Sequence, residues 1–341
     1  MKPLALTLIT TLSILVPAYA EFRTFTSSAG TTLKGELVSV VGDTVTLKKE
    51  DGTPLTLKLS AFSRVDQAWL QTQAKAAPAA ASATDPSKAT KEAPFVNSLG
   101  MKFVPVPGTN VLFCIHETRR KDYAAYASAS SGVDTAWKNQ KMLGKNVSEK
   151  DNDPVVGVSW EDAKAFCAWL TKKDSHTARL PTDREWSFAV GIGEREQAGA
   201  SPGSLHAKIA DAYPWGSWPL QPGAGNYYDK TSVPILRPKK TDGAANMPGY
   251  LDGFGYDDGY PLTAPVMSFQ PNNLGIYDLG GNVWELCEDL YSPAETDITY
   301  RGSSYGFDGM TNMLSSARVH QPRTERLPHA GFRVVLELPK P

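Results

Sequence analysis

Cysteine is scarce in this chain, which has three in 341 residues: Cys114, Cys167 and Cys287. An odd number leaves at least one thiol unpaired within a monomer, so a dense disulfide framework is excluded. We interpret Cys167 as a buried thiol that packs as a small apolar side chain. The sequence leaves open a disulfide between Cys114 and Cys287, because their separation in space is not encoded locally.

The chain also lacks an excess of positive or of negative charge. The chain has 35 Lys and Arg against 36 Asp and Glu, for a formal net charge of -1. This balance argues against a strongly basic face for nucleic acid or an anionic membrane. No two of the five histidines are three or four residues apart, so no helix is expected to offer a metal two histidines on one face. What is abundant instead is Gly, Pro and aromatic residues, which favours a loop-rich fold.

Long apolar runs are absent too, apart from a short one at the start. Leu4 to Val16 is apolar but too short to span a bilayer comfortably. It follows Lys2 and precedes Ala18-Tyr19-Ala20, a small-x-small cleavage pattern. We therefore predict a signal peptide at residues 1–20. The mature protein is expected to be exported, to the periplasm or the medium, with no membrane span.

Residues 21–70 alternate in the manner of β-strands, with turns at Gly30, Gly42-Asp43 and Asp51-Gly52. The pattern ends in Leu59-Ser60 followed by Ser63 and Asp66. This stretch resembles a small SH3-like β-barrel and is similar to the clathrin-adaptor homology domain. The resemblance implies a peptide-binding or scaffold module, although a plain folded spacer fits the pattern equally well.

The next segment, residues 71–93, has no aromatic or branched aliphatic side chain and is rich in Ala, Pro, Ser, Thr and Lys. Such a composition cannot offset the entropy of folding, so we predict a disordered linker. Residues 94–337 then read as one domain. Ser159 with Asp162, and Thr182 with Glu185, are capping-box pairs that predict two helix starts.

Five ordered motifs in this domain carry a family resemblance. They are Asn97 to Gly108, Arg179 to Trp186, Tyr213-Pro214-Trp215-Gly216, Asn273 to Asp289 and Arg301-Gly302-Ser303-Ser304-Tyr305. Together they resemble the formylglycine-generating enzyme, or sulfatase-modifying factor, family. The resemblance implies an α+β domain of C-type-lectin-like fold, with little regular secondary structure and long ordered loops.

The chemistry of that family is not matched by the residues here. Its members oxidise a cysteine of a sulfatase with copper(I) held by two cysteines just after the Arg-Gly strand. In an ungapped register these positions are Phe307 and Asn312, and neither supplies the thiolate that copper(I) selects. We read Met310 and Met313 as packing residues rather than as copper ligands. Copper is therefore not expected.

The resemblance also implies structural calcium at two sets of hard oxygen donors. The first set is Asn226, the Tyr227 carbonyl, Asp258 and the Tyr260 carbonyl. The second set is Asp278, the carbonyls of Gly281 and Val283, and Glu285. An alternative stays open for each, because Asp258 could only cap a turn and Glu285 could form a buried ion pair.

A ligand cleft is a further expectation. In catalytic relatives the segment 318–330 lines the peptide-binding site, and here it offers charge-assisted donors for a carboxylate, a sulfate or a peptide. The candidate cleft residues are Arg318, His320, Arg323, Arg326 and His329. A solvated polar loop is the alternative. We interpret Trp215 and Trp284 as core residues.

Taken together, the sequence predicts an exported, calcium-stabilised binding or accessory module for a peptide or glycan. The alternative is an oxidoreductase of the same superfamily that acts on protein through a divergent metal site. The sequence does not decide the ligand, the role of the predicted barrel or the oligomeric state.

Overall fold

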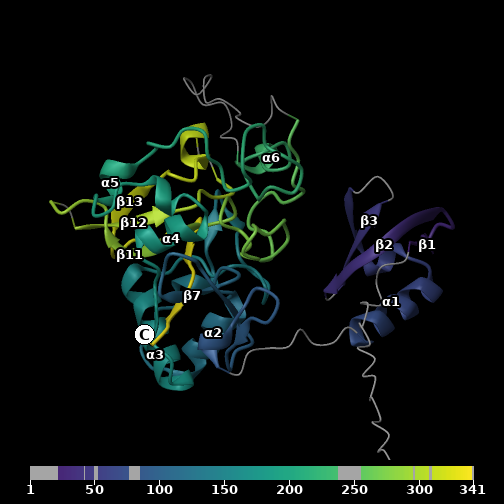
Figure 1. Cartoon of the computed structure of the whole chain (residues 1–341), viewed down its shortest axis with the longest axis horizontal. Helices are drawn as coiled ribbons and strands as arrows, with labels where there is room; N and C mark the ends of the chain where they lie inside the picture. Colours follow the sequence, from purple (N-terminus) through teal and green to yellow (C-terminus); the bar gives the residue numbers. More distant parts are fainter. Residues whose placement is uncertain are drawn as a thin grey trace, which may run out of the picture. The chain divides into compact units, whose positions relative to one another are not determined.

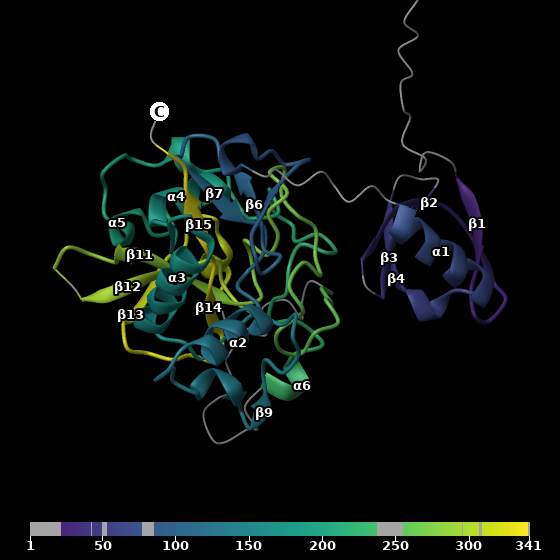
Figure 2. The same cartoon turned by 90° about the horizontal axis from the view of Figure 1, so that it is seen from below.

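The computed structural model describes residues 22–41, 43–49, 53–76, 85–236, 255–294, 296–306 and 309–339. They fall into two compact units, Met1–Ala80 and Ala81–Pro341, shown in Figures 1 and 2 and described here separately. The predicted signal peptide lies outside the described residues. Within the described ranges, no helix combines the length and apolar character needed to cross a membrane.

The first unit is a four-stranded antiparallel sheet with a helix packed on it (Figure 2). The strands follow one another in the order β1-β2-β3-β4. The bounds are β1 Arg23–Thr26, β2 Thr32–Val41, β3 Thr44–Lys49 and β4 Pro54–Lys58, then the short 3-10 turn η1 Leu59–Ala61 and helix α1 Arg64–Ala76.

The alternation of apolar residues in these strands builds the core of this unit. Val45 and Leu47 of β3 are fully buried, and Phe25 packs edge-on against Trp69 of α1. Asp66 of α1 is buried and accepts hydrogen bonds from the Thr26 amide and from Arg23. The predicted strands are thus present, while their assignment to an SH3-like barrel stays a prediction.

The ends of the predicted linker differ from the expectation. Helix α1 continues to Ala76, and residues 85–93 form a turn around η2 (Pro86–Lys88) in which Asp85 accepts from the Ser87 amide at 2.9 Å. Ala89 is 9% exposed and packs against the core of the second unit. Small side chains that cannot build a core can still pack on one. Residues 77–84 of the predicted linker lie outside the described residues.

The second unit contains three sheets. A five-stranded sheet has the order β10-β15-β7-β6-β5, a four-stranded sheet has the order β13-β12-β11-β14, and β8 and β9 form a hairpin. The bounds are β5 Phe95–Val96, β6 Lys102–Pro105, β7 Val111–Cys114, β8 Lys141–Met142, β9 Lys145–Asn146, β10 Ala178–Arg179, β11 Trp284–Leu290, β12 Asp297–Arg301, β13 Val319–Pro322, β14 Ala330–Phe332 and β15 Val335–Glu337.

Three helices of this unit, α2, α3 and α4, begin with capping boxes formed by nearby side chains. Both predicted starts are confirmed, because Ser159 and Thr182 form capping boxes with Asp162 and Glu185. The bounds are α2 Arg120–Ala129, α3 Trp160–Asp174, α4 Asp183–Ala189, α5 Pro202–Leu205 and α6 Val233–Leu236, with 3-10 turns η3 Ala136–Lys138, η4 Gly193–Arg195 and η6 Met310–Met313.

An aromatic core joins the helices to the sheets. Phe166 of α3 stacks on Tyr123 of α2 and meets Phe332 of β14 edge-on, with ring centres 5.9 and 5.4 Å apart. Helices and sheets mix as the α+β prediction requires. Between α5 and β11, α6 is the one helix or strand among the described residues, so the chain there runs as long loops. These loops build the cavity described next.

Candidate functional site

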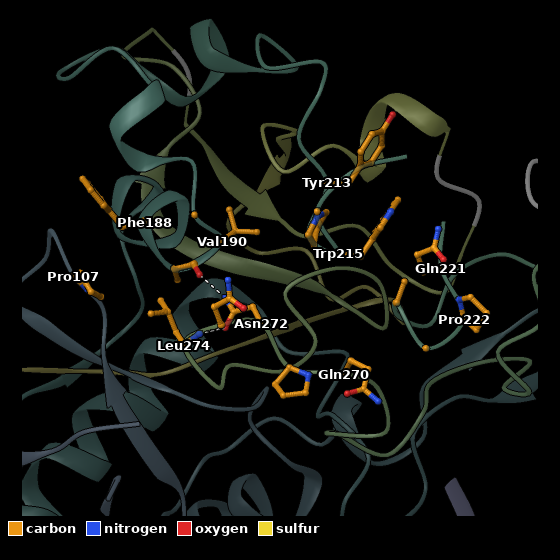
Figure 3. Close-up of a pocket in the computed structure, with 18 residues that line it drawn as sticks. Pro107, Phe188, Val190, Tyr213, Trp215, Gln221, Pro222, Gln270, Asn272 and Leu274 are labelled. Atoms are coloured by element: carbon orange, nitrogen blue, oxygen red, sulfur yellow. Dashed lines mark hydrogen bonds between the residues drawn. The ribbon is translucent and has the colours of Figure 1, made fainter. Parts of the chain in front are cut away.

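A cavity of about 590 Å³ opens between the end of α4 and the long loops that precede β11 (Figure 3). This volume lies within the range of small-ligand sites, about 300–1,000 Å³. Figure 3 shows Tyr213 and Trp215 on one side and Pro107 and Phe188 on the other. The lining residues are Pro107, Phe188–Gly191, Tyr213–Gly216, Gln221–Ala224 and Gln270–Leu274.

One wall is an aromatic pair held by a tight turn. Tyr213 and Gly216 exchange two backbone hydrogen bonds, which the φ of +109° at Gly216 permits. The rings of Tyr213 and Trp215 stack 4.7 Å apart, and Trp215 Nε1 donates to the Ser217 carbonyl at 3.1 Å. The prediction of two core tryptophans therefore holds for Trp284, which is 3% exposed, and holds only in part for Trp215, which is half-buried, packs against Tyr227 and also lines the cavity.

The opposite wall depends on Phe188, a residue that no motif in the sequence marks. Its ring lies between two glycines, because a Cβ on Gly108 or on Gly193 would come within 2.4 Å of it. The Arg184 guanidinium lies 4.9 Å from the ring centre. The φ of +85° at Gly108 gives a second reason for glycine there. The Phe188 ring is therefore packed closely against the backbone at both glycines.

The polar lining consists of amide side chains. Asn272 is structural, since it donates to the Ala189 carbonyl and accepts from the amides of Leu274 and Ile276. Gln221, Gln270 and Asn273 are exposed. None of the lining residues within the described ranges carries a charged side chain. The cavity can therefore offer ring faces and neutral hydrogen-bonding groups.

The two positions that correspond to the copper cysteines belong to a different stretch of the sequence from the residues that line the cavity. Phe307 is outside the described residues, and Asn312 is in η6, half-buried.

All three cysteines are buried and free, so the disulfide left open between Cys114 and Cys287 is not formed. Burial raises the pKa of Cys114 to about 12 and the pKa of Cys287 well above its usual value. These thiols are not poised to be thiolate ligands.

The predicted cleft at residues 318–330 is not assembled. Arg318 is 1% exposed, and its guanidinium is bound by Asp183 at 2.9 Å and Glu196 at 2.7 Å. Arg301, also buried, reaches Asp183 at 2.6 Å. Arg318 thus holds α4 and η4 to the sheet rather than facing a ligand. Burial by itself would raise the pKa of Asp183, but the two guanidinium groups outweigh it and hold that pKa below its usual value.

The other predicted cleft residues are dispersed over separate contacts. His320 stacks on Tyr291 and pairs with Asp297. Arg323 lies over the Trp160 ring, and Arg326 pairs with Asp162. The His329 carbonyl accepts from the Trp284 amide at 2.9 Å. No member of this group lines the cavity, and the buried Arg318 also distinguishes the segment from the solvated polar loop of the alternative interpretation.

The first predicted calcium set is brought together by Asp258. Its carboxylate accepts from the backbone amides of Tyr227 and Tyr260 at 2.9 and 2.8 Å. The Asn226 Oδ1 is buried and has no hydrogen-bond partner among the described residues. Burial and the nearby Asp229 raise the pKa of Asp258 to about 7. A cation would satisfy the unpaired Asn226 oxygen and stabilise the buried Asp258 carboxylate, so these donors fit calcium. The bond from the Tyr260 amide, two residues on, equally matches the turn cap of the alternative interpretation, and calcium here stays a prediction.

The second predicted calcium set fits less well. Asp278 has one buried oxygen without a partner, and burial raises its pKa to about 6. Glu285, however, is bound by Arg333 at 2.5 Å and accepts from Trp186 Nε1 at 3.0 Å. It forms the buried ion pair of the alternative interpretation. Across the described ranges, no group of three or more His, Cys, Asp or Glu side chains is arranged to hold a metal.

Glu117 is a buried carboxylate that sequence reasoning missed. It is 0% exposed, and accepts from Asn282 Nδ2 at 2.6 Å and from the Val283 amide at 3.2 Å. Burial, with Asp278 and Glu285 nearby, raises the pKa of Glu117 well above its usual value. Its partners lie about 165 residues further along the chain, so no local motif marks it.

The comparisons with known proteins agree on one family. The model of the sulfatase-modifying factor enzyme 1-like domain matches residues 69–338. The chain is 32% identical over 211 residues to Inactive C-alpha-formylglycine-generating enzyme 2 of Mus musculus, covering 60% of this chain and 56% of the relative. It is 34% identical over 156 residues to the formylglycine-generating enzyme of Thermomonospora curvata, covering 46% and 40%. The chain thus spans about half the length of the curated relatives it matches.

Solved structures give a weaker likeness. PvdO from Pseudomonas aeruginosa superposes with a TM-score of 0.45 at 22% identity, over 67% of this chain and 80% of that chain.

Proposed function

We propose that this chain, which belongs to the sulfatase-modifying factor enzyme 1-like domain family, is a recognition or accessory module and not a formylglycine-generating oxidase. One observation carries the proposal. The second copper position is the amide Asn312, and the three thiols of the chain are buried elsewhere, where burial raises the pKa of each. An amide cannot replace the soft thiolate that copper(I) requires. The name of the mouse relative, which describes that protein as inactive, supports the same direction.

The cavity beside Trp215 is the candidate recognition site. It combines a stacked aromatic pair with exposed amides, and concave aromatic sites with a few polar groups are typical of ligand binding. The loops that form it would be stabilised by calcium at the set of Asn226 and Asp258, where the donors fit. We further propose export of the mature protein, with the first unit serving as a scaffold or peptide-binding module.

The test uses the purified full chain reconstituted with copper(I) and a cysteine peptide that carries a sulfatase motif. The Thermomonospora curvata formylglycine-generating enzyme serves as the positive control. We expect no oxygen-dependent aldehyde in the peptide by mass spectrometry, because no thiolate pair holds the metal. Aldehyde formed by the unmodified chain, and lost when its metal is stripped, would overturn the proposal.

A further inference from the structure

The absence of charge in the cavity restricts what it can bind. A carboxylate, sulfate, phosphate or ammonium group placed there would lose its water without gaining an opposite charge. Lys91 and Arg184 lie beside the cavity lining, and the charged group of each already interacts with another group of the protein. Lys91 Nζ donates to the Asn273 carbonyl at 2.9 Å, and Arg184 lies over the Phe188 ring. The described lining therefore favours a neutral ligand.

The aromatic wall favours a ligand with a flat C–H face. Trp215 and Tyr213 form a stacked pair whose ring planes are 25° apart, so each ring covers one face of the other and a ligand would meet an outer ring face and the ring edges. Ring faces carry negative electrostatic potential and attract the weakly positive hydrogens of C–H bonds. The axial C–H groups on one face of a pyranose ring have this character.

The amides favour a ligand rich in hydroxyl groups. Gln221, Gln270 and Asn273 each combine an acceptor oxygen with an NH₂ donor, and a hydroxyl likewise both donates and accepts. Gln221 Nε2 donates one hydrogen bond to the Pro219 carbonyl, and its oxygen can still act as an acceptor. Gln221, Gln270 and Trp215 line the same cavity (Figure 3), so it offers polar groups as well as rings.

An extended peptide is the less suitable occupant. Peptides that add to a sheet need an unpaired strand edge, and none of the described lining residues belongs to a strand. A peptide in a polyproline helix needs donors for its carbonyls, and two lining donors are already engaged, Trp215 Nε1 by Ser217 and the Asn272 amide by Ala189; the exposed Gln and Asn amides remain and would serve either ligand class. We infer that the cavity binds a neutral saccharide, stacked on Trp215 and hydrogen-bonded by Gln270 and its neighbours.

This inference rests on the proposed recognition function and is tested on the full chain by calorimetric titration. The probes are cellohexaose, maltohexaose and the hexasaccharide of N-acetylglucosamine. We expect at least one to bind, with tryptophan fluorescence changing in parallel. Trp215→Ala should weaken that binding about tenfold, through the loss of stacking. Gln270→Ala should weaken it about threefold, through the loss of a neutral hydrogen bond.

Matched variants separate binding from folding. Trp215→Phe keeps a ring and should bind within about threefold of the parent chain. Gln197→Ala removes an exposed glutamine that does not line the cavity, and should leave binding unchanged. If Trp215→Ala does not fold by circular dichroism, the Gln270→Ala and Gln197→Ala pair decides, because both side chains are exposed.

Two outcomes would overturn the inference. One is that none of the three saccharides binds, or that neither Trp215→Ala nor Gln270→Ala changes the affinity. The other is that an Ala-Pro-rich peptide or hexagalacturonic acid binds in a Trp215-dependent manner while the neutral sugars do not. In the second case the recognition function stands and only the ligand class is wrong, whereas aldehyde formation with copper(I) would reject the recognition function itself.

Discussion

Asp183 is a carboxylate on which two buried guanidinium groups converge. Arg301 and Arg318 are each 0–1% exposed; Arg301 Nη1 donates to Asp183 Oδ1, while Arg318 donates from Nε to Oδ1 and from Nη2 to Oδ2. Removing one partner of a buried ion pair leaves the other charge without compensation, which costs much more than the intact pair contributes. The residue therefore matters for stability although it has no place in the cavity.

We expect Asp183→Asn to lower the free energy of unfolding by about 3–5 kcal/mol at pH 7, measured by urea denaturation. The parent carboxyl has a depressed pKa in the fold, so its stabilising effect is complete above its usual value of 3.8 and is lost as pH falls through the folded value. The difference between parent and variant should therefore shrink on acidification below pH 4.

The control is Asp211→Asn, which removes the carboxylate of an exposed ion pair with Arg195. Its urea midpoint should match that of the parent chain, because exposed pairs contribute little. A parent-minus-variant difference for Asp183→Asn that stays constant from pH 7 to pH 3 would contradict the assignment of the effect to this carboxylate.

At the level of elements, α3 shows how local chemistry defines a boundary. Ser159 accepts from the Asp162 amide at 3.2 Å, and the Asp162 carboxylate accepts from the Ser159 amide at 2.9 Å. Both bonds satisfy donors that the first turn of a helix leaves unpaired. The helix then buries Phe166 and Leu170 in the core, so its start fixes the position of both.

Ser159→Ala is expected to cost about 1 kcal/mol in the free energy of unfolding, through the loss of this cap. Ser128→Ala is the matched change, because Ser128 lies within α2 and its hydroxyl only donates to the Ala124 carbonyl of the same helix. Its effect should stay within about 0.5 kcal/mol. Equal losses for the two variants in urea denaturation would argue against a capping role.

Helix starts could be predicted from the sequence, whereas buried ion pairs and the exposure of side chains in turns could not. The caps at Ser159 and Thr182 were predictable because donor and acceptor are three residues apart. The role of Arg318 was not, since its partner Asp183 is 135 residues away and a loop arginine looks the same whether buried or solvated. The partial exposure of Trp215 was not predictable for a related reason, because the sequence of a turn does not show whether other segments cover its tryptophan.

At the scale of the whole second unit, long loops must be held without much regular secondary structure. The fit of the Asn226 and Asp258 donors to calcium indicates one way of holding them. Asp258 itself bonds loop segments 31 residues apart, through the Tyr227 amide. A cation there would link the loop that follows the cavity-lining segment Gln221–Ala224 to the loop that precedes Gln270.

Chelation of calcium should accordingly lower the melting temperature of the full chain. A ligand that binds only the native state at 100 times its Kd adds about 2.7 kcal/mol, which corresponds to several degrees. Asp258→Ala should abolish most of this response in differential scanning calorimetry, whereas Asp134→Ala, which removes a carboxylate outside the proposed set, should keep it. An identical melting temperature with and without calcium, in protein shown to be free of the metal, would refute the site.

The order of strands in the five-stranded sheet has a consequence for biosynthesis. β15 lies between β10 and β7, and its residues Val335 and Leu336 pair with Phe113 and Leu112, which leave the ribosome more than 200 positions earlier. A nascent chain that stops short of Val335 carries every other strand of this sheet but not the one that joins its two parts. Folding of this sheet therefore waits for β15, and β7 keeps an unpaired edge until Val335–Glu337 has been made.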